Sequence, residues 1–209
     1  QKHMDYVLKK GFPRTNARFV PNGLDTDRIK LVSTVADQRE YDFLMFGWNY
    51  EIKGVDLCIE AIMKLQDEQF KVAIVGSDKI EHTIREKYGD ISGIEVVEPV
   101  SDVNDLYKKS KCFLHISRAE GLSYALLEAV YAGIPVICSN ISENKFANIF
   151  PTVMMVESEN VTDIAEKMKL SMSNYRCSED MIKISREIID ENYSIECWVK
   201  NMVKQYEEV

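Results

Sequence analysis

The sequence predicts an α/β fold in which helices cover both faces of a doubly wound, parallel β-sheet. Short apolar segments of strand length alternate with segments whose apolar residues recur at helical spacing. Most of the strand segments are apolar on both faces, which is typical of strands buried between two layers of helices. Ligands of such sheets bind beyond the carboxyl ends of the strands, so we expect a site in the loops at that edge.

The expected elements follow one another in a regular order. Strands are expected at residues 41–48, 71–77, 94–100, 112–117 and 134–140, with a sixth at 152–156. Helices are expected at residues 54–65, 84–90, 102–110 and 122–132 between the strands, and at 161–172, 178–192 and 194–209 at the end of the chain. Ser101 stands where the N-cap of the 102–110 helix belongs, and Gly133 closes the 122–132 helix.

The composition and charge of the chain exclude several classes of protein. The chain has 209 residues, of which 45% are hydrophobic and 29% charged, so it can bury a sizeable core. A net charge of −8 argues against a nucleic-acid-binding surface, which needs clustered Lys and Arg. No segment reaches the roughly 18 apolar residues of a membrane span. The five cysteines are scattered and form no CxxC pair, which fits buried thiols of a cytoplasmic protein without a metal site.

One helical segment carries an unusual carboxylate. Residues 124–132, YALLEAVYA, are apolar or aromatic at every position except Glu128. Burying a carboxylate without partners is costly, so we expect Glu128 to have a binding role rather than to be an ordinary solvated residue. In the preceding loop, Gly121 would let a ligand approach the backbone. The amides of Leu122 and Ser123 are expected in the first helical turn, where unpaired N–H groups favour a phosphate.

A second carboxylate, Glu120, precedes Glu128 by eight residues. At the helical rise this spacing corresponds to about 12 Å, which is near the distance between the sugar and the ribose of a nucleoside diphosphate sugar. A carboxylate can accept two hydrogen bonds from a cis diol. A diphosphate at the helix start would therefore leave Glu120 at the sugar and Glu128 at the ribose. The plainer alternative for Glu120 is an ordinary loop carboxylate.

The segment SRAEGLSYALLEAVYAGIPVICSNI resembles the C-terminal domain signature of the retaining glycosyltransferases of family four, which have the two-Rossmann GT-B fold. The match is an E-x7-E motif, Glu120 to Glu128, followed by a Gly-Ile-Pro-Val-Ile turn. Three more segments agree in order and spacing: FVPNGLD, LMFGWNYEIKGVDLCIEA and VSDVNDLYKKSKCFLHIS. The resemblance extends from about Arg18 to the C-terminus, and the combination of segments is more specific than any one of them.

The resemblance implies a role for each matched residue. The first glutamate of the motif contacts the donor sugar and the second binds the ribose, which assigns these roles to Glu120 and Glu128. The lysine of the Lys-Gly pair binds the leaving phosphates, which assigns that role to Lys53. The other donor-binding candidates are backbone amides, glycines and nucleobase-loop residues: Gly121, Leu122, Ser123, Gly47, Gly54, Val100, Ser101 and Val103.

The chain departs from the family pattern at Trp48, where an arginine that binds the diphosphate is common. Trp48 supplies no charge, so stabilisation of the leaving group falls more heavily on Lys53 and the helix start. Arg118 is a candidate to compensate, and Trp48 is a candidate for the wall of the pocket. His115 is expected as a strand residue near the edge of the sheet rather than as a catalytic group.

The implied activity is that of a hexosyltransferase in polysaccharide biosynthesis, which transfers sugar from a nucleotide donor, most commonly a UDP-sugar, with retention of configuration. No cofactor or metal is required, because lysine and amides neutralise the charge. Two alternatives remain. One is a non-catalytic nucleotide-sugar-binding or interaction module with a degenerate phosphate site. The other is a different two-Rossmann enzyme, such as a phosphorylase or a sugar-nucleotide epimerase, which the intact E-x7-E motif disfavours.

The resemblance also implies how the chain is divided. Residues 1–16 are expected to be a remnant of a preceding segment, and residues 17–192 the donor-binding domain. Residues 193–209 are expected to form a helix that packs back on an acceptor-binding N-terminal domain absent from this chain. Such a fragment should bind nucleotide weakly and be inactive alone. The full-length enzyme is expected in the cytoplasm, with peripheral membrane association as an option.

Overall fold

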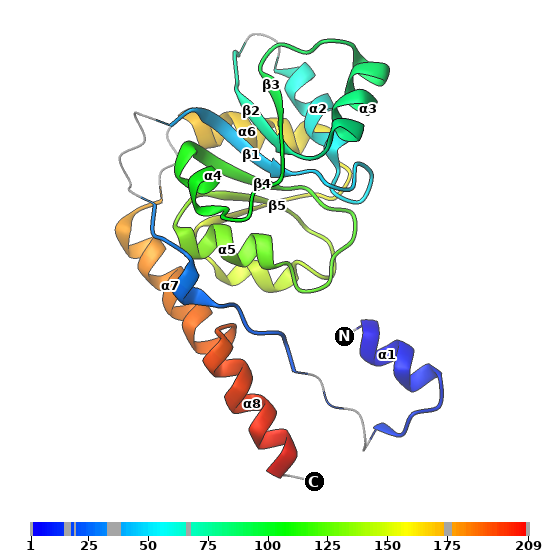
Figure 1. The fold of residues 1–209 in the computed structure, drawn as a ribbon, viewed down its shortest axis with the longest axis vertical. Helices are drawn as coiled ribbons and strands as arrows, with labels where there is room; N and C mark the ends of the chain where they lie inside the picture. Colours follow the sequence, from blue (N-terminus) through cyan, green and yellow to red (C-terminus); the bar gives the residue numbers. More distant parts are fainter. Residues whose placement is uncertain are drawn as a thin grey trace.

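A computed structural model describes residues 2–14, 18, 20–32, 39–65, 68–173 and 177–207. Within these residues, six strands form one sheet in the order β3-β2-β1-β4-β5-β6 (Figure 1). All neighbouring strands pair in parallel. The strands are β1 (Tyr41–Phe46), β2 (Val72–Val75), β3 (Ile94–Val97), β4 (Ser110–His115), β5 (Val136–Ser139) and β6 (Val153–Val156). The predicted doubly wound parallel sheet is confirmed.

Alternate residues of each strand enter two separate cores, one on each face of the sheet. Phe43 and Met45 of β1 join the core that also contains α2, α3 and α6, whereas Leu44 joins the core that contains α4, α5 and α7. These helices are α2 (Val55–Lys64), α3 (Asp78–Tyr88), α6 (Val161–Ser173), α4 (Asn104–Lys109), α5 (Tyr124–Ala132) and α7 (Glu179–Asn192). Burial on both faces explains why most strand positions are apolar.

The strand order places a topological switch point between β1 and β4. From β1 the chain continues outward to β2 and β3, and it then returns to the other side of β1 as β4. Because β1 and β4 pair in parallel, with Met45 opposite Leu114, their carboxyl ends lie side by side. The loop after β1 leads to α2 on one face of the sheet and the loop after β4 leads to α5 on the other, and ligands of such folds bind at this point.

The sequence placed three helix starts incorrectly. α4 begins at Asn104, and the side chain of Asp102 rather than that of Ser101 accepts a hydrogen bond from the Asn104 amide, at 3.0 Å. α3 begins at Asp78, six residues before the expected start at 84. α5 begins at Tyr124 with Ser123 as its N-cap, so the amides expected in its first turn precede the helix. These starts depend on hydrogen bonds that apolar spacing does not reveal.

The expected end of α5 is confirmed. Gly133 is its C-cap and has the left-handed φ of 83° that glycine favours at this position.

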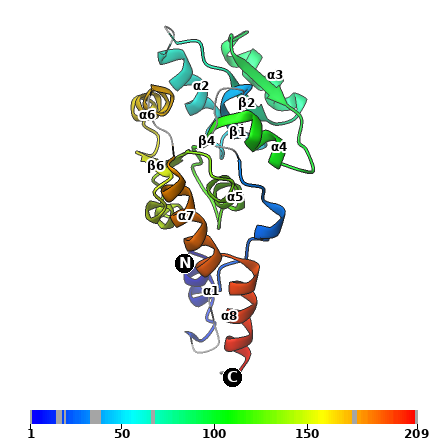
Figure 2. The same cartoon turned by 90° about the vertical axis from the view of Figure 1, so that its left-hand side faces the viewer.

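The last helix, α8 (Ile195–Glu207), continues in the direction of α7 away from the sheet (Figures 1 and 2). The short α1 (Lys2–Lys9) also lies away from the sheet in both views. No residue of α8 is buried, and its apolar and aromatic residues Ile195, Val199, Val203 and Tyr206 are exposed. The expected packing of residues 193–209 on another domain stays a prediction. No helix in the described ranges has the length and apolarity needed to cross a membrane.

Candidate active site

Two glycines of the β1–α2 loop make close contacts, Gly54 with the residue after β4 and Gly47 with β2. A Cβ at Gly54 would lie 2.2 Å from the carbonyl oxygen of Ile116, and Gly54 has a left-handed φ of 68°. A Cβ at Gly47 would lie 2.6 Å from the side chain of Ile74 in β2. Glycine at both positions therefore allows the β1–α2 loop to pack closely on its neighbours. This packing places Lys53, the residue before Gly54, against the loop that carries Glu120.

Lys53 and Glu120 form an ion pair at the carboxyl edge of the sheet. The distance from Lys53 Nζ to Glu120 Oε1 is 2.5 Å, and the two side chains are only 9% and 10% exposed. Lys53 Nζ also lies 4.9 Å from the centroid of the Trp48 ring, a cation–π contact. Trp48 is 64% exposed and covers the lysine. The structure therefore brings these three predicted residues into one cluster.

His115, the last residue of β4, lies beside this cluster. It is buried, as expected for a strand residue, but its Nε2 is 3.6 Å from Glu120 Oε1 and has no hydrogen-bond partner among the described residues. The pKa of His115 is lowered to about 4, chiefly by burial and also by Lys53, whereas Glu120 opposes the shift. The imidazole is therefore neutral near pH 7 and adds no charge to the site.

The depressed pKa of His115 predicts a loss of stability in acid. The unfolded chain takes up this proton near pH 6.5, whereas the folded protein takes it up only near pH 4. The stabilisation is complete above pH 6.5 and is lost as the pH falls toward 4, by about 3 kcal/mol. We expect urea unfolding of His115→Gln to vary less steeply with pH over this range than that of the unsubstituted protein. Identical pH dependence would contradict the prediction.

The start of α5 offers unpaired amides beside the ion pair. Ser123 Oγ accepts from the amide of Leu126, at 3.4 Å, and the Ser123 carbonyl accepts from Leu127. The amides of residues 121–125 donate to no acceptor in the part of the chain that the structure describes. A Cβ added at Gly121 would have no neighbour within 4 Å, so the approach to these amides is open. Such amides at a helix start favour an anion.

Glu128 is buried, as its apolar neighbours indicate, and its side chain is only 7% exposed. The hydroxyl of Tyr107, in α4, donates to Glu128 Oε2 at 3.3 Å. The guanidinium of Arg28, from the short 3-10 helix η2 (Thr26–Arg28), pairs with Glu128 Oε1. The pKa of Tyr107 is raised well above its usual value by burial and by Glu128. The carboxylate therefore has two partners that the sequence did not predict.

The two glutamates have different neighbours. Glu120 contacts Lys53 and His115, whereas Glu128 contacts Tyr107 and Arg28. The predicted separation of about 12 Å required a continuous helix from Glu120 to Glu128. Glu120 instead lies four residues before the start of α5. Both acids nevertheless flank the exposed start of this helix, with Glu120 in the loop before it and Glu128 in its second turn.

Arg118 links three loops through its guanidinium. Its two terminal nitrogens donate to Asp56, each at 2.8 Å, and its Nε donates to Glu159 at 2.8 Å. Its Nη1 also donates to the carbonyl of Glu51 at 2.7 Å. These contacts raise the pKa of Arg118, chiefly through Asp56. Its assignment to the diphosphate stays a prediction, and these contacts favour a role in holding the β1–α2 and β4–α5 loops together.

The predicted nucleobase residues lie in the β3–α4 loop at the same edge of the sheet. Val100 and Ser101 are exposed, and Val103 is half-buried as the N-cap of α4.

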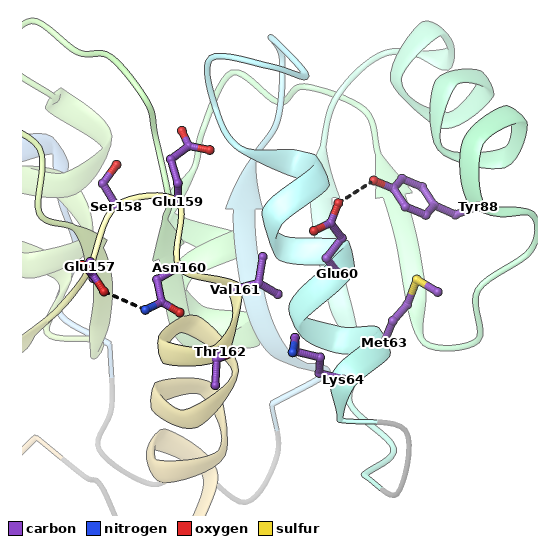
Figure 3. Close-up of a pocket in the computed structure, with 10 residues that line it drawn as sticks. All are labelled: Glu60, Met63, Lys64, Tyr88, Glu157, Ser158, Glu159, Asn160, Val161 and Thr162. Carbon is purple, nitrogen blue, oxygen red and sulfur yellow. Dashed lines mark hydrogen bonds between the residues drawn. The ribbon is translucent and has the colours of Figure 1, made fainter.

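A separate groove of about 790 Å³ lies between α2, the end of α3 and the loop before α6 (Figure 3). Its lining is Glu60, Met63, Lys64, Tyr88, Glu157, Ser158, Glu159, Asn160, Val161 and Thr162. Glu60 accepts from the hydroxyl of Tyr88, and Glu157 accepts from the side chain of Asn160. None of these lining residues was predicted from the sequence. Their acidic character makes the groove a poor site for a diphosphate.

Glycosyltransferases are among the curated proteins that resemble this chain in sequence. Over 127 residues the chain is 29% identical to the lipopolysaccharide glucosyltransferase WaaG of Escherichia coli K12, and the match covers 58% of this chain and 33% of that protein. Over 150 residues it is 27% identical to the capsular polysaccharide biosynthesis glycosyltransferase CapH of Staphylococcus aureus, covering 68% of this chain and 41% of that protein. The chain thus spans less than half the length of these curated relatives.

Solved structures share the fold at lower identity. Anabaena Alr3699/HepE, crystallised with UDP, superposes with a TM-score of 0.80 at 13% identity over 99% of this chain and 61% of that chain. A glycosyltransferase from Rickettsia africae superposes with a TM-score of 0.79 at 18% identity, over 98% of this chain and 61% of that chain.

The parallel sheet with its polar cluster at the switch point defines a Rossmann-like domain of the kind found in the C-terminal halves of GT-B enzymes. The sequence model of the family described as "Glycosyl transferases group 1" matches residues 40–174, more than half of the chain. The chain belongs to this glycosyltransferase family.

Proposed function

We propose that this chain is the donor-binding half of a retaining glycosyltransferase that takes a hexosyl group from a UDP-sugar. The observation that carries the proposal is the buried Lys53–Glu120 pair beside the open amides of residues 121–125. A cation and several unpaired amides at one place form a site for a diphosphate. The UDP in the Anabaena structure and the glucosyltransferase among the relatives support the choice of donor.

The contacts indicate how the donor would be bound. The diphosphate accepts hydrogen bonds from the amides of residues 121–125, and Lys53 turns from Glu120 to the phosphates. Glu120 can then accept hydrogen bonds from hydroxyls of the sugar, and Glu128 from those of the ribose. Lys53 and the amides stabilise the negative charge that develops on the leaving diphosphate. No metal ion is needed for this charge in our proposal.

A non-catalytic binding module is the second candidate, because Trp48 lies over Lys53 and adds no charge to the phosphate site. Donor hydrolysis by the full-length protein separates the two candidates. Turnover of UDP-glucose supports the enzyme, whereas binding without turnover supports the module. We propose that the full-length protein also has an acceptor-binding domain and acts in the cytoplasm.

The division of roles between the glutamates can be tested by calorimetric titration of this chain with UDP and UDP-glucose. We expect Glu120→Gln to weaken UDP-glucose binding by about tenfold, because a sugar contact is lost. UDP binding should be unchanged or tighter, because Lys53 no longer has a competing partner. Glu86→Gln, on the exposed surface of α3, is the matched control. Equal losses for both ligands would contradict the assignment of Glu120 to the sugar.

A further inference from the structure

The segment of residues 24–32 crosses the α4–α5 face of the domain and is fixed to it at both ends. The amide of Leu24 donates to the carbonyl of Tyr193 at 2.6 Å, and that of Val32 donates to the carbonyl of Ala132 at 2.9 Å. The side chains of Leu24 and Val32 are buried in the core. The segment therefore has a defined position beside α5.

Asn104, the first residue of α4, fixes the middle of this segment. Its side-chain nitrogen donates to the carbonyl of Arg28 at 2.9 Å, and its side-chain oxygen accepts from the amide of Lys30 at 2.8 Å. The backbone of Arg28 is thus hydrogen-bonded to the start of the helix that follows the predicted nucleobase loop. This contact holds the Arg28 side chain within reach of Glu128.

The Arg28–Glu128 pair is asymmetric. The arginine side chain is 59% exposed, whereas the glutamate side chain is 7% exposed. The solvated guanidinium loses little hydration, yet it provides a counter-ion to a carboxylate among apolar neighbours. Two groups thus face Glu128, Arg28 from the 24–32 segment and the neutral Tyr107 hydroxyl from α4. Around Arg28 itself, Asp102 and Lys30 are the neighbouring charges.

We propose that Arg28 is a positioning residue for Glu128, whose carboxylate it orients to receive the two hydroxyls of a nucleoside ribose. This inference rests on the proposed function, in which Glu128 binds the ribose. Each carboxylate oxygen can accept two hydrogen bonds. With Arg28 on Oε1 and Tyr107 on Oε2, each oxygen retains capacity for one ribose hydroxyl.

The test is calorimetric titration of UDP and of 2′-deoxy-UDP into the unsubstituted chain and its variants. For Arg28→Gln we expect about tenfold weaker binding of UDP. The loss should be smaller for 2′-deoxy-UDP, because that nucleotide offers only one ribose hydroxyl to the carboxylate that Arg28 orients. Arg28→Lys should retain most of the affinity, because it keeps the charge. Lys30→Gln, a neighbouring cation on the same segment, is the matched control.

The results distinguish a failure of the role of Arg28 from a failure of the proposed function. Failure of the unsubstituted chain to bind UDP would overturn both. Weak binding by Glu128→Gln together with unchanged binding by Arg28→Gln would overturn only the role of Arg28. A loss in Arg28→Gln that is the same for UDP and 2′-deoxy-UDP would also overturn it, because a direct phosphate contact would act in that way. Thermal unfolding of each variant identifies any effect that comes from loss of the fold.

Discussion

Replacing Lys53 by alanine should weaken the binding of UDP more than any other single change at this site. The substitution removes the cation from the proposed diphosphate site and leaves the carboxylate of Glu120 buried without its partner. Removing one partner of a buried charge pair between a protein and its ligand, here the proposed contact of Lys53 with the diphosphate, costs about 2–5 kcal/mol, so we expect UDP affinity to fall by at least about thirtyfold. Calorimetric titration measures the change directly.

Two further variants test whether the loss of UDP affinity comes from the removal of Lys53 from the diphosphate site. Lys64→Ala removes an exposed lysine that lines the groove beside α2 and should leave UDP binding unchanged. The double variant Lys53→Ala/Glu120→Gln should recover part of the affinity, because the unpaired negative charge is gone. A strong loss in Lys64→Ala with none in Lys53→Ala would place the nucleotide in the groove instead.

Gly54→Ala should destabilise the fold by about 3 kcal/mol or more, the largest effect we expect on stability. The left-handed φ of 68° costs a non-glycine residue on the order of 1 kcal/mol. The added Cβ would also lie 2.2 Å from the backbone oxygen of Ile116, which cannot rotate away as a side chain can. The β1–α2 and β4–α5 loops must then separate, and Lys53 moves away from Glu120.

Gly89→Ala provides a matched control for this prediction. Gly89 has a φ of 73° and a ψ of −159°, a combination almost confined to glycine, but a Cβ there would have no neighbour within 4 Å. Only the conformational cost, about 1–3 kcal/mol, should remain, without a clash with the backbone. Urea unfolding of both variants gives the comparison. Equal destabilisation would show that the close approach of Gly54 to Ile116 contributes nothing to stability.

The order of elements could be predicted because it depends on local patterns. The doubly buried strands are apolar at most positions, and the Glu120 and Glu128 motif lies in one segment of chain. The start of α5 was less predictable, because it is set by the hydroxyl of Ser123 rather than by apolar spacing. The apolar run begins at Leu122, before the Ser123 cap, so the sequence predicted a helix start that was too early.

The partners of Glu128 could not be found in this way. Arg28 is 100 residues from Glu128 in the chain, and Tyr107 is 21 residues away on another helix. Only the packing of α4, α5 and the 24–32 segment brings the three side chains together. For a similar reason, Arg118 was a candidate phosphate ligand in the sequence, although the fold surrounds it with Asp56 and Glu159.

A crystal structure of this chain with UDP tests the central claim most directly. We expect the diphosphate on the amides of residues 121–125 with Lys53 Nζ turned toward it, and the ribose hydroxyls on Glu128. Electron density for UDP in the groove between α2 and the loop before α6, with the Lys53–Glu120 pair undisturbed, would contradict the account.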